Sequence, residues 1–314
     1  MTDRVERWDW RVRELGPALG VEVEGVDLRR RLAPDEIETL RRLFDDHGLL
    51  VFRQQEISED DQLRICTHLR PVTDPVAWIS NVEPGFHPEG ELWYHSDYAF
   101  TPHPMLGLSL FAIELAPGAV PTMFASNSRA HDRLPDVLRR RLAELRVVHC
   151  IDSISGRDNL RTRLDDVGGD AAPTDVYPRH ARPAIWAHPV TGRPLLFVLE
   201  QQASHFEGWS CCESDELLDA AFEVLYEPTN VHAHHWQAGD FVVWDNLMFQ
   251  HGRPANPNSV RRSLRRIAMN TVTTTELIAG TGFDPEVRAR RATRPPRVTG
   301  RASRARCDGR RRPV

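Results

Sequence analysis

The chain has 314 residues, of which 40% are hydrophobic and 8% aromatic, and its formal net charge at pH 7 is −5. This length and composition suit a globular protein with a sizeable core. The sequence has no run of about 18 uncharged apolar residues, so it predicts no transmembrane helix and no membrane partner. Its charged start, Met1–Glu6, lacks the apolar region of a secretory signal, which favours a cytoplasmic protein.

Positive charge is carried by arginine alone and is concentrated at the C-terminus. Residues 287–314 hold eleven arginines and one acid, a balance of +10, which leaves −15 for the rest of the chain. This composition cannot bury a core, so we expect one domain over residues 1–283 and a disordered tail over 284–314. The tail could bind nucleic acid through phosphate contacts, but no stacking motif accompanies it, so a solvated tail is preferred.

The five cysteines are an odd number without the spacing of a metal site. Cys211 and Cys212 are adjacent, and adjacent cysteines rarely bridge. We therefore expect reduced thiols, in agreement with a cytoplasmic location.

The N-terminal half is predicted to combine short strands with amphipathic helices. Alternation over residues 19–24 predicts a strand, and the apolar run 49–52 predicts a buried one. A Pro-Asp-Glu start predicts a helix over 34–47, and a Ser-Glu-Asp-Asp start predicts another over 58–69. Residues 71–92 are rich in Pro and Gly and are expected to form a long, lid-like loop.

Strands dominate the predicted C-terminal half. They are expected over residues 95–100, 106–115, 241–245 and 266–274, with a hairpin of 184–188 and 195–199, and helices over 134–145 and 214–227. Residues 152–183 are polar and are expected to form a second lid-like loop. Many strands with few helices predict a mainly β protein with flanking helices (α+β), built on a cupin-like jelly-roll core, the double-stranded β-helix.

The triplet His95-Ser96-Asp97, together with the distant His251, is the most informative feature of the sequence. In an extended strand, residues i and i+2 point to the same face, so His95 and Asp97 could hold one metal ion. Two histidines and one carboxylate are the ligand set of non-haem Fe(II) oxygenases. The apolar neighbours of Asp97 strengthen the prediction, because a buried carboxylate is costly unless it is paired.

A second group of histidines, His232-Ala233-His234-His235, could indicate another metal site. Its place at a predicted strand end favours a structural role instead.

Further motifs extend the pattern along the chain. They are Trp244-Asp245-Asn246 with Gln250-His251, His188–Arg193, and the N-terminal Gly25–Leu28 with Val51–Gln55. Through them, residues 13–275 resemble the taurine dioxygenase (TauD/TfdA) family of Fe(II)- and 2-oxoglutarate-dependent oxygenases. The resemblance implies that His95, Asp97 and His251 bind the iron.

The resemblance also implies sites for 2-oxoglutarate and O2. It places Thr122 and Arg266 at the distal carboxylate of 2-oxoglutarate, where a hydroxyl and a guanidinium fork suit an anion. Arg262 is a weaker candidate on the same face of the predicted strand, and Arg265 should point away. Trp244 either lines this pocket or packs in the core.

Two departures from the family pattern bear on these assignments. Residues Ala119-Val120-Pro121 replace the Gly-Gly-Asp that often precedes the threonine of the family. The acidic ligand, Asp97, argues against the related halogenases, which need a vacant position for chloride.

By the same resemblance, the candidates for substrate contact are Trp78, Asn81, Glu91, Gln202 and His205. Glu91 stands where the taurine branch has an asparagine, which disfavours an anionic sulfonate. A small metabolite of a specialised biosynthetic pathway is the preferred substrate.

The family implies an enzyme that oxidises a C–H bond of a small molecule, most simply by hydroxylation, with release of succinate and CO2. Desaturation, cyclisation or epoxidation would use the same residues. Two alternatives belong to other classes: a non-catalytic metal- or ligand-binding protein on the same barrel, and a nucleic-acid-modifying oxygenase recruited by the basic tail. The sequence leaves open whether the protein forms a homo-oligomer.

Overall fold

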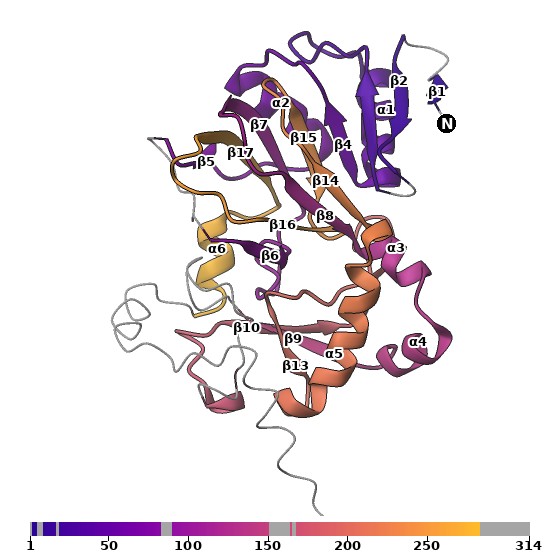
Figure 1. The fold of residues 1–314 in the computed structure, drawn as a ribbon, viewed down its shortest axis with the longest axis vertical. Helices are drawn as coiled ribbons and strands as arrows, with labels where there is room; N and C mark the ends of the chain where they lie inside the picture. Colours follow the sequence, from indigo (N-terminus) through magenta and orange to yellow (C-terminus); the bar gives the residue numbers. More distant parts are fainter. Residues whose placement is uncertain are drawn as a thin grey trace, which may run out of the picture.

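The computed structural model describes residues 2–4, 9–16, 19–82, 90–150, 164 and 168–282 (Figure 1). Its larger sheet contains, in spatial order, β1 (Thr2–Arg4), β2 (Arg11–Glu14), β3 (Val21–Glu24), β4 (Leu49–Phe52), β15 (Phe241–Asp245), β7 (Gly107–Leu115), β17 (Arg262–Met269) and β5 (Ala77–Ser80). A second sheet contains β14 (Val231–His234), β8 (Thr122–Ser126), β16 (Phe249–Arg253) and β6 (Leu92–His95). Segments distant in sequence are therefore neighbours in both sheets.

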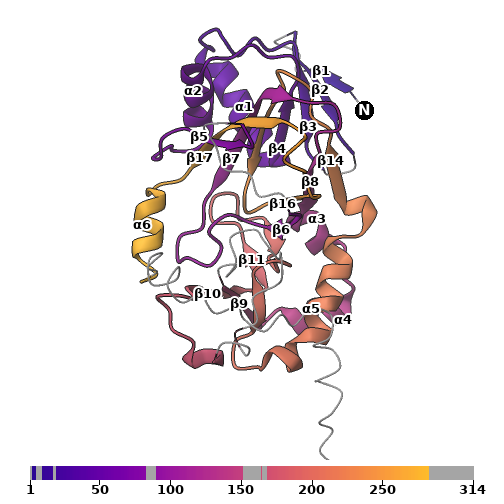
Figure 2. The ribbon, with the colours of Figure 1, turned by 60° about the vertical axis from the view of Figure 1, so that its left-hand side comes forward.

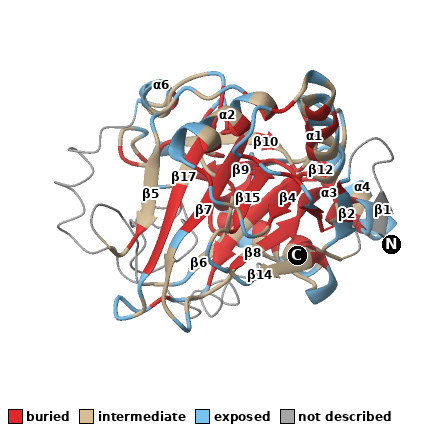
Figure 3. Cartoon of the chain, turned by 90° about the horizontal axis from the view of Figure 1, so that it is seen from above, coloured by how far each residue is buried: buried red, intermediate tan, exposed pale blue. Residues whose placement is uncertain are grey.

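The two sheets face each other across an apolar core. In β15, Phe241 and Val243 point to a core shared with the helices α1 (Pro34–His47) and α2 (Glu59–Leu69). The alternate residue Val242 points to a second core, which includes Phe124 of β8 and Phe249 of β16. Figure 3 shows the buried central strands with α1 and α2 beside them. This is the predicted mainly β, jelly-roll arrangement.

Local sequence explains where α1 and α2 begin and end. Helix α1 starts with Pro34 and ends at His47, and Gly48, which follows it, has a φ of 69° in the left-handed region. A side chain there would also meet Met248, since a Cβ would lie 2.9 Å from its Cε. Ser58 caps α2 and accepts a hydrogen bond from the backbone N–H of Asp61. Both helices agree with the predicted ranges.

The remaining elements form a smaller layer, seen below the two main sheets in Figures 1 and 2. They are the strands β9 (Arg146–Cys150), β10 (Arg179–Pro183) and β13 (Ala203–Phe206), the hairpin β11 (Ile185–Ala187) and β12 (Pro194–Leu196), the helices α3 (Asn127–Asp132), α4 (Asp136–Leu142) and α5 (Cys211–Leu225), and the 3-10 turns Gly169–Ala171 and Pro228–Asn230. Leu217 and Leu218 of α5 share an apolar core with Val147 of β9 and Phe206 of β13. The hairpin forms where it was predicted, although β12 begins one residue before the predicted range and ends three residues earlier.

Several predicted boundaries are wrong. The strand predicted over residues 95–100 ends at His95, because the chain turns at Asp97 and Tyr98 adopts a left-handed φ of 59°. The last core strand is β17, which ends at Met269, and Thr273 then caps α6 (Thr274–Ala279). Residues 71–92 include strand β5, whose apolar run the flanking prolines concealed. Pro135 delays the start of α4, which is shorter than predicted.

Parts of both predicted lids and the predicted tail lie outside the described residues. These parts are residues 83–89, 152–163, 165–167 and 284–314. The end of the second predicted lid is ordered as strand β10.

The cysteine prediction is only partly met. Cys66, Cys150 and Cys211 are buried and form no disulfide. Cys212 is disulfide-bonded, so the expectation of a reduced thiol is wrong there. Adjacency disfavours a bridge within the pair but not a bridge from one member to a cysteine elsewhere. Among the described residues, no helix is long and apolar enough to cross a membrane.

Buried histidines make stability depend on pH. Burial, with the charge of Arg182 nearby, lowers the pKa of His149 from 6.5 to about 3, and burial lowers the pKa of His232 to about 4. Between these values and 6.5 the unfolded chain binds more protons than the folded one, so stability falls as the pH falls. We expect a lower Tm at pH 5 than at pH 7.5 in calorimetric scans. In His149→Leu this difference should shrink, and an unchanged difference would contradict the assignment.

Candidate metal centre

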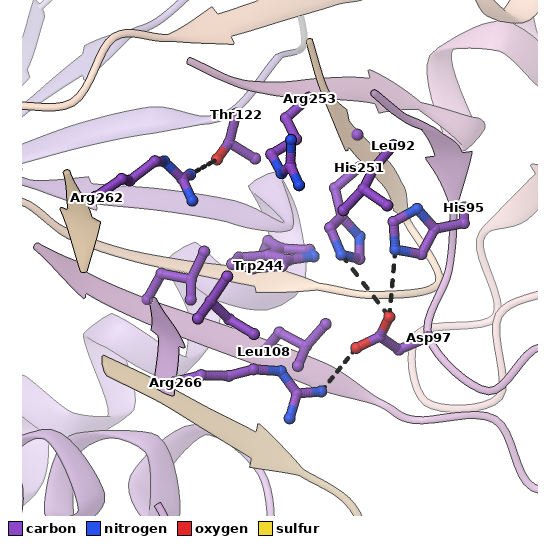
Figure 4. A pocket seen from close by; sticks show the side chains of 13 residues that line it. Leu92, His95, Asp97, Leu108, Thr122, Trp244, His251, Arg253, Arg262 and Arg266 are labelled. Carbon is purple, nitrogen blue, oxygen red and sulfur yellow. Dashed lines mark hydrogen bonds and ion pairs between the residues drawn. The ribbon is translucent and has the colours of Figure 1, made fainter. Parts of the chain in front are cut away.

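His95, Asp97 and His251 converge at the wall of one pocket (Figure 4). One ligand atom from each residue lies within 4.8 Å of the others, and this is the only such group of three among the described residues. The Nε2 atom of His95 is 3.4 Å from Oδ1 of Asp97, and Nε2 of His251 is 3.9 Å from the same oxygen. Two imidazole nitrogens and a carboxylate at this spacing fit a divalent metal ion that keeps open positions.

Strand pairing, rather than one continuous strand, brings the cluster together. His251 of β16 is the register partner of His95 of β6, and their ring centroids are 4.2 Å apart. Asp97 lies in the turn after β6, so the prediction that it shares a strand face with His95 is wrong. Asn246 fixes that turn: its Oδ1 accepts from the backbone N–H of Asp97, and its Nδ2 donates to the carbonyl of Asp97.

Hydrogen bonding and charge prepare these side chains for a cation. Nδ1 of His95 lies 2.8 Å from the carbonyl oxygen of Trp93, which assigns its proton to Nδ1 and leaves the Nε2 lone pair facing the cluster. Burial, with the neighbouring His95, lowers the pKa of His251 to about 3, so its imidazole is neutral. Burial alone would raise the pKa of Asp97, but the contact with His95 and the charge of Arg266 hold it well below its usual range.

Arg262 and Arg266 both line the pocket beside the cluster, as their two-residue periodicity predicts, but they make different contacts. An Nη of Arg262 donates to Oγ1 of Thr122 at 3.1 Å, and an Nη of Arg266 donates to Oδ2 of Asp97 at 2.7 Å. Arg265 points away and donates to Gln62 of α2. Thr122 is therefore brought together with Arg262, the weaker candidate from sequence, and Arg266 lies at the cluster itself.

The Trp-Asp-Asn segment divides into a pocket residue and two structural ones. Trp244 packs in the core and also lines the pocket, with its ring centroid 5.0 Å from that of His251. Asp245 is buried, and both of its carboxylate oxygens lie 3.1 Å from Nε2 of His188. Nδ1 of His188 in turn accepts the backbone N–H groups of Val190 and Thr191. This network ties the β11–β12 hairpin to the turn that precedes His251.

Replacing His188 by alanine should lower the free energy of unfolding by about 2–3 kcal/mol, because the buried carboxylate of Asp245 loses one of its donors. Denaturant unfolding would measure this loss. His235→Ala, at an exposed position, is the matched control and should change stability by less than about 0.5 kcal/mol. Equal effects of the two substitutions would rule out a structural role for the His188–Asp245 contact.

The five residues predicted to contact substrate do not line this pocket. Trp78 lies on β5, but its neighbour Ile79 faces the pocket instead. Asn81 accepts the backbone N–H of Arg262 and donates to the carbonyl of Val260, a structural contact. Glu91 is exposed. His205, on β13 of the smaller layer, and Gln202, just before that strand, are buried.

Sequence reasoning missed several residues that do line the pocket. Arg253 lies two positions beyond His251 on β16, a spacing that could have identified it. It is buried, and burial lowers its pKa to about 10. Ile79, Leu92, Leu108 and Leu110 supply an apolar wall that no motif marks.

The histidines at 232–235 form a separate structural contact. Nε2 of His234 lies 3.1 Å from the buried carboxylate of Asp240, which also pairs with Arg53.

Comparison with known proteins decides the family. A model of the family described as "Taurine catabolism dioxygenase TauD, TfdA family" matches residues 11–268. The chain belongs to the TauD/TfdA family. It is 30% identical over 279 residues to the alpha-ketoglutarate-dependent 2,4-dichlorophenoxyacetate dioxygenase of Cupriavidus pinatubonensis, with 80% of this chain and 94% of the relative covered.

Other members of the TauD/TfdA family support the same assignment. Pentalenolactone F synthase of Streptomyces avermitilis is 28% identical, with 80% of this chain and 91% of the relative covered. The solved structure of AAD-2 in complex with Mn(II) and N-oxalylglycine superposes with a TM-score of 0.70 at 25% identity, covering 84% of this chain and 98% of that chain. The protein is therefore a dioxygenase dependent on α-ketoglutarate (2-oxoglutarate), with a jelly-roll core, and its family implies a metal ion and O2.

Proposed function

We propose that the protein uses Fe(II), 2-oxoglutarate and O2 to hydroxylate a C–H bond of a small anionic metabolite. One oxygen atom enters the substrate as a hydroxyl group, and the other enters the succinate formed as 2-oxoglutarate loses CO2. The observation that carries this proposal is the cluster of His95, Asp97 and His251 inside a pocket that also presents three arginines.

In this proposal His95, Asp97 and His251 hold the iron. When bound, Fe(II) with 2-oxoglutarate supplies the activation of O2 that C–H oxidation requires. The residues of the chain bind and orient the reactants, and the apolar wall of Leu108 and Leu110 excludes water from the pocket.

Arg262 and Thr122 are the proposed anchor for the distal carboxylate of 2-oxoglutarate, in place of the pairing of Arg266 with Thr122 expected from sequence. Arg262 is 1% exposed, and no carboxylate pairs with it among the described residues. A buried guanidinium is costly without an anion, and burial lowers its pKa to about 9. A carboxylate held by this arginine and by the Thr122 hydroxyl would remove that cost.

Charge in the pocket supports an anionic substrate. Among its described lining residues, Arg262 and Arg266 face a single carboxylate, Asp97. A divalent metal and the two carboxylates of 2-oxoglutarate cancel each other, so the excess of positive charge persists in the loaded pocket. Arg266 is the proposed contact for the substrate anion, because its fork carries donors beyond the one given to Asp97. A phenoxyacetate, as named for the Cupriavidus relative, is an anion of this kind.

Anaerobic addition of Fe(II) and 2-oxoglutarate to the metal-free protein tests the cofactor site. A weak visible charge-transfer band is expected when the 2-oxo acid chelates the iron. Admitting air with a panel of aryl- and alkyl-carboxylates, beside their neutral amides, then tests the substrate class. We expect succinate release with the acids and a product 16 mass units heavier; a product lighter by two would indicate desaturation. No band, or turnover of the amides alone, would contradict the corresponding part of the proposal.

A further inference from the structure

The hydroxyl of Thr122 has both of its acceptor positions occupied. The indole Nε1 of Trp236 donates to Oγ1 at 3.0 Å, and Arg262 donates to the same oxygen at 3.1 Å. A hydroxyl offers two lone pairs and one proton, so its proton must point in a third direction. Within the described part of the chain no acceptor receives it, and Thr122 lines the pocket.

Trp236 also packs against a residue outside the pocket, His234. Its ring stands edge-on to His234, with centroids 4.5 Å apart, and His234 contacts the buried Asp240. The guanidinium carbon of Arg262 lies 5.9 Å from the Trp236 ring centroid, at the limit of a cation–π contact. Trp236 is not among the residues that line the pocket, so any effect on a ligand must pass through Thr122 and Arg262.

We propose that Trp236 is a positioning residue for 2-oxoglutarate. By filling one lone pair of Thr122, its N–H leaves the hydroxyl able only to donate into the pocket, toward the same carboxylate that Arg262 contacts. This inference rests on the proposed function, since it concerns the distal carboxylate of 2-oxoglutarate. It predicts that Trp236 affects only ligands that carry such a carboxylate.

Trp236→Phe removes the N–H and keeps an aromatic ring beside Arg262. Calorimetric titration of the Mn(II)-loaded protein would compare 2-oxoglutarate with 2-oxopentanoate, which keeps the chelating end and replaces the distal carboxylate by a methyl group. The Kd for 2-oxoglutarate should rise about three- to ten-fold, the effect of one neutral hydrogen bond. The Kd for 2-oxopentanoate should stay unchanged. Trp209→Phe, at a surface position, is the matched control and should change neither Kd.

A double-mutant cycle separates positioning from general packing. In a Thr122→Val background, Trp236→Phe should have no further effect on the Kd for 2-oxoglutarate, because the hydroxyl through which it acts is gone. Additive effects, equal weakening of both ligands, or an unchanged Kd for 2-oxoglutarate in Trp236→Phe would each overturn the inference. If the wild-type protein binds neither ligand, the proposed 2-oxoglutarate site itself fails, a result distinct from any difference between variants.

Discussion

His95→Ala should abolish the charge-transfer band of the Fe(II)–2-oxoglutarate complex and reduce turnover by more than about 100-fold. Loss of a residue that only hydrogen-bonds to a metal ligand costs about 10–100-fold in metal affinity or activity. His95 supplies a ligand atom of the cluster itself, so its loss should cost more. The remaining pair, Asp97 and His251, would hold the cation through two side chains only. Anaerobic absorption spectroscopy and a succinate assay would measure both effects.

Two controls keep this result interpretable. His235→Ala, an exposed histidine close to the second sheet, should bind metal and turn over like the wild type. Thermal unfolding of His95→Ala should show a folded protein, because His95 lies at the end of a short strand and not in the apolar core. A folded His95→Ala variant that retained the band would remove His95 from the proposed ligand set.

Arg262→Gln and Arg266→Gln should each weaken the binding of a different reactant. Arg262→Gln should raise the Kd for 2-oxoglutarate by about 10–100-fold, because a charge-assisted hydrogen bond contributes about 1.5–3 kcal/mol. Arg266→Gln should instead raise the KM for the anionic substrate by a similar factor and change the Kd for 2-oxoglutarate by less than about three-fold.

Arg266 contacts the proposed metal ligand Asp97, so the affinity of each variant for the metal must also be measured. Mn(II) binding, followed by electron paramagnetic resonance, should be within about three-fold of wild type in both variants if each arginine acts on its own reactant. The reverse pattern, with 2-oxoglutarate binding lost in Arg266→Gln, would restore the assignment that the family resemblance implied. The two assignments therefore make opposite predictions for the same pair of proteins.

The sequence identified the members of the cluster but not the backbone that presents them. The aromatic residues around Asp97 indicate a strand, whereas Tyr98 takes a left-handed conformation that period-two reasoning cannot detect. His95 and His251 meet because β6 and β16 are paired, and strand pairing is a tertiary property. The helices α1 and α2 were predictable because their start and stop signals are local.

For the arginines of β17, the sequence likewise predicted which side chains share a face but not which partners they contact. Periodicity predicted that Arg262 and Arg266 share a face and that Arg265 does not, and the structure agrees. Which of the two meets Thr122 depends on the register of β17 against β7 and on the bulge between Ser263 and Leu264. Of the predicted substrate contacts, Trp78 does not line the pocket whereas its neighbour Ile79 does, because successive residues of β5 point to opposite faces.

The sheet order has a consequence for synthesis of the chain. Strand β4, near residue 50, pairs with β15, near residue 243, and β6 has its paired partner in β16. A nascent chain therefore cannot assemble the cluster until the segment carrying His251 has left the ribosome, and the arginines of β17 follow later still. The final fold depends on contacts that close very long loops, which slows folding and leaves unpaired strand edges exposed in the meantime. The three cluster residues can therefore bind a metal ion together only after almost the whole described chain has been made and folded.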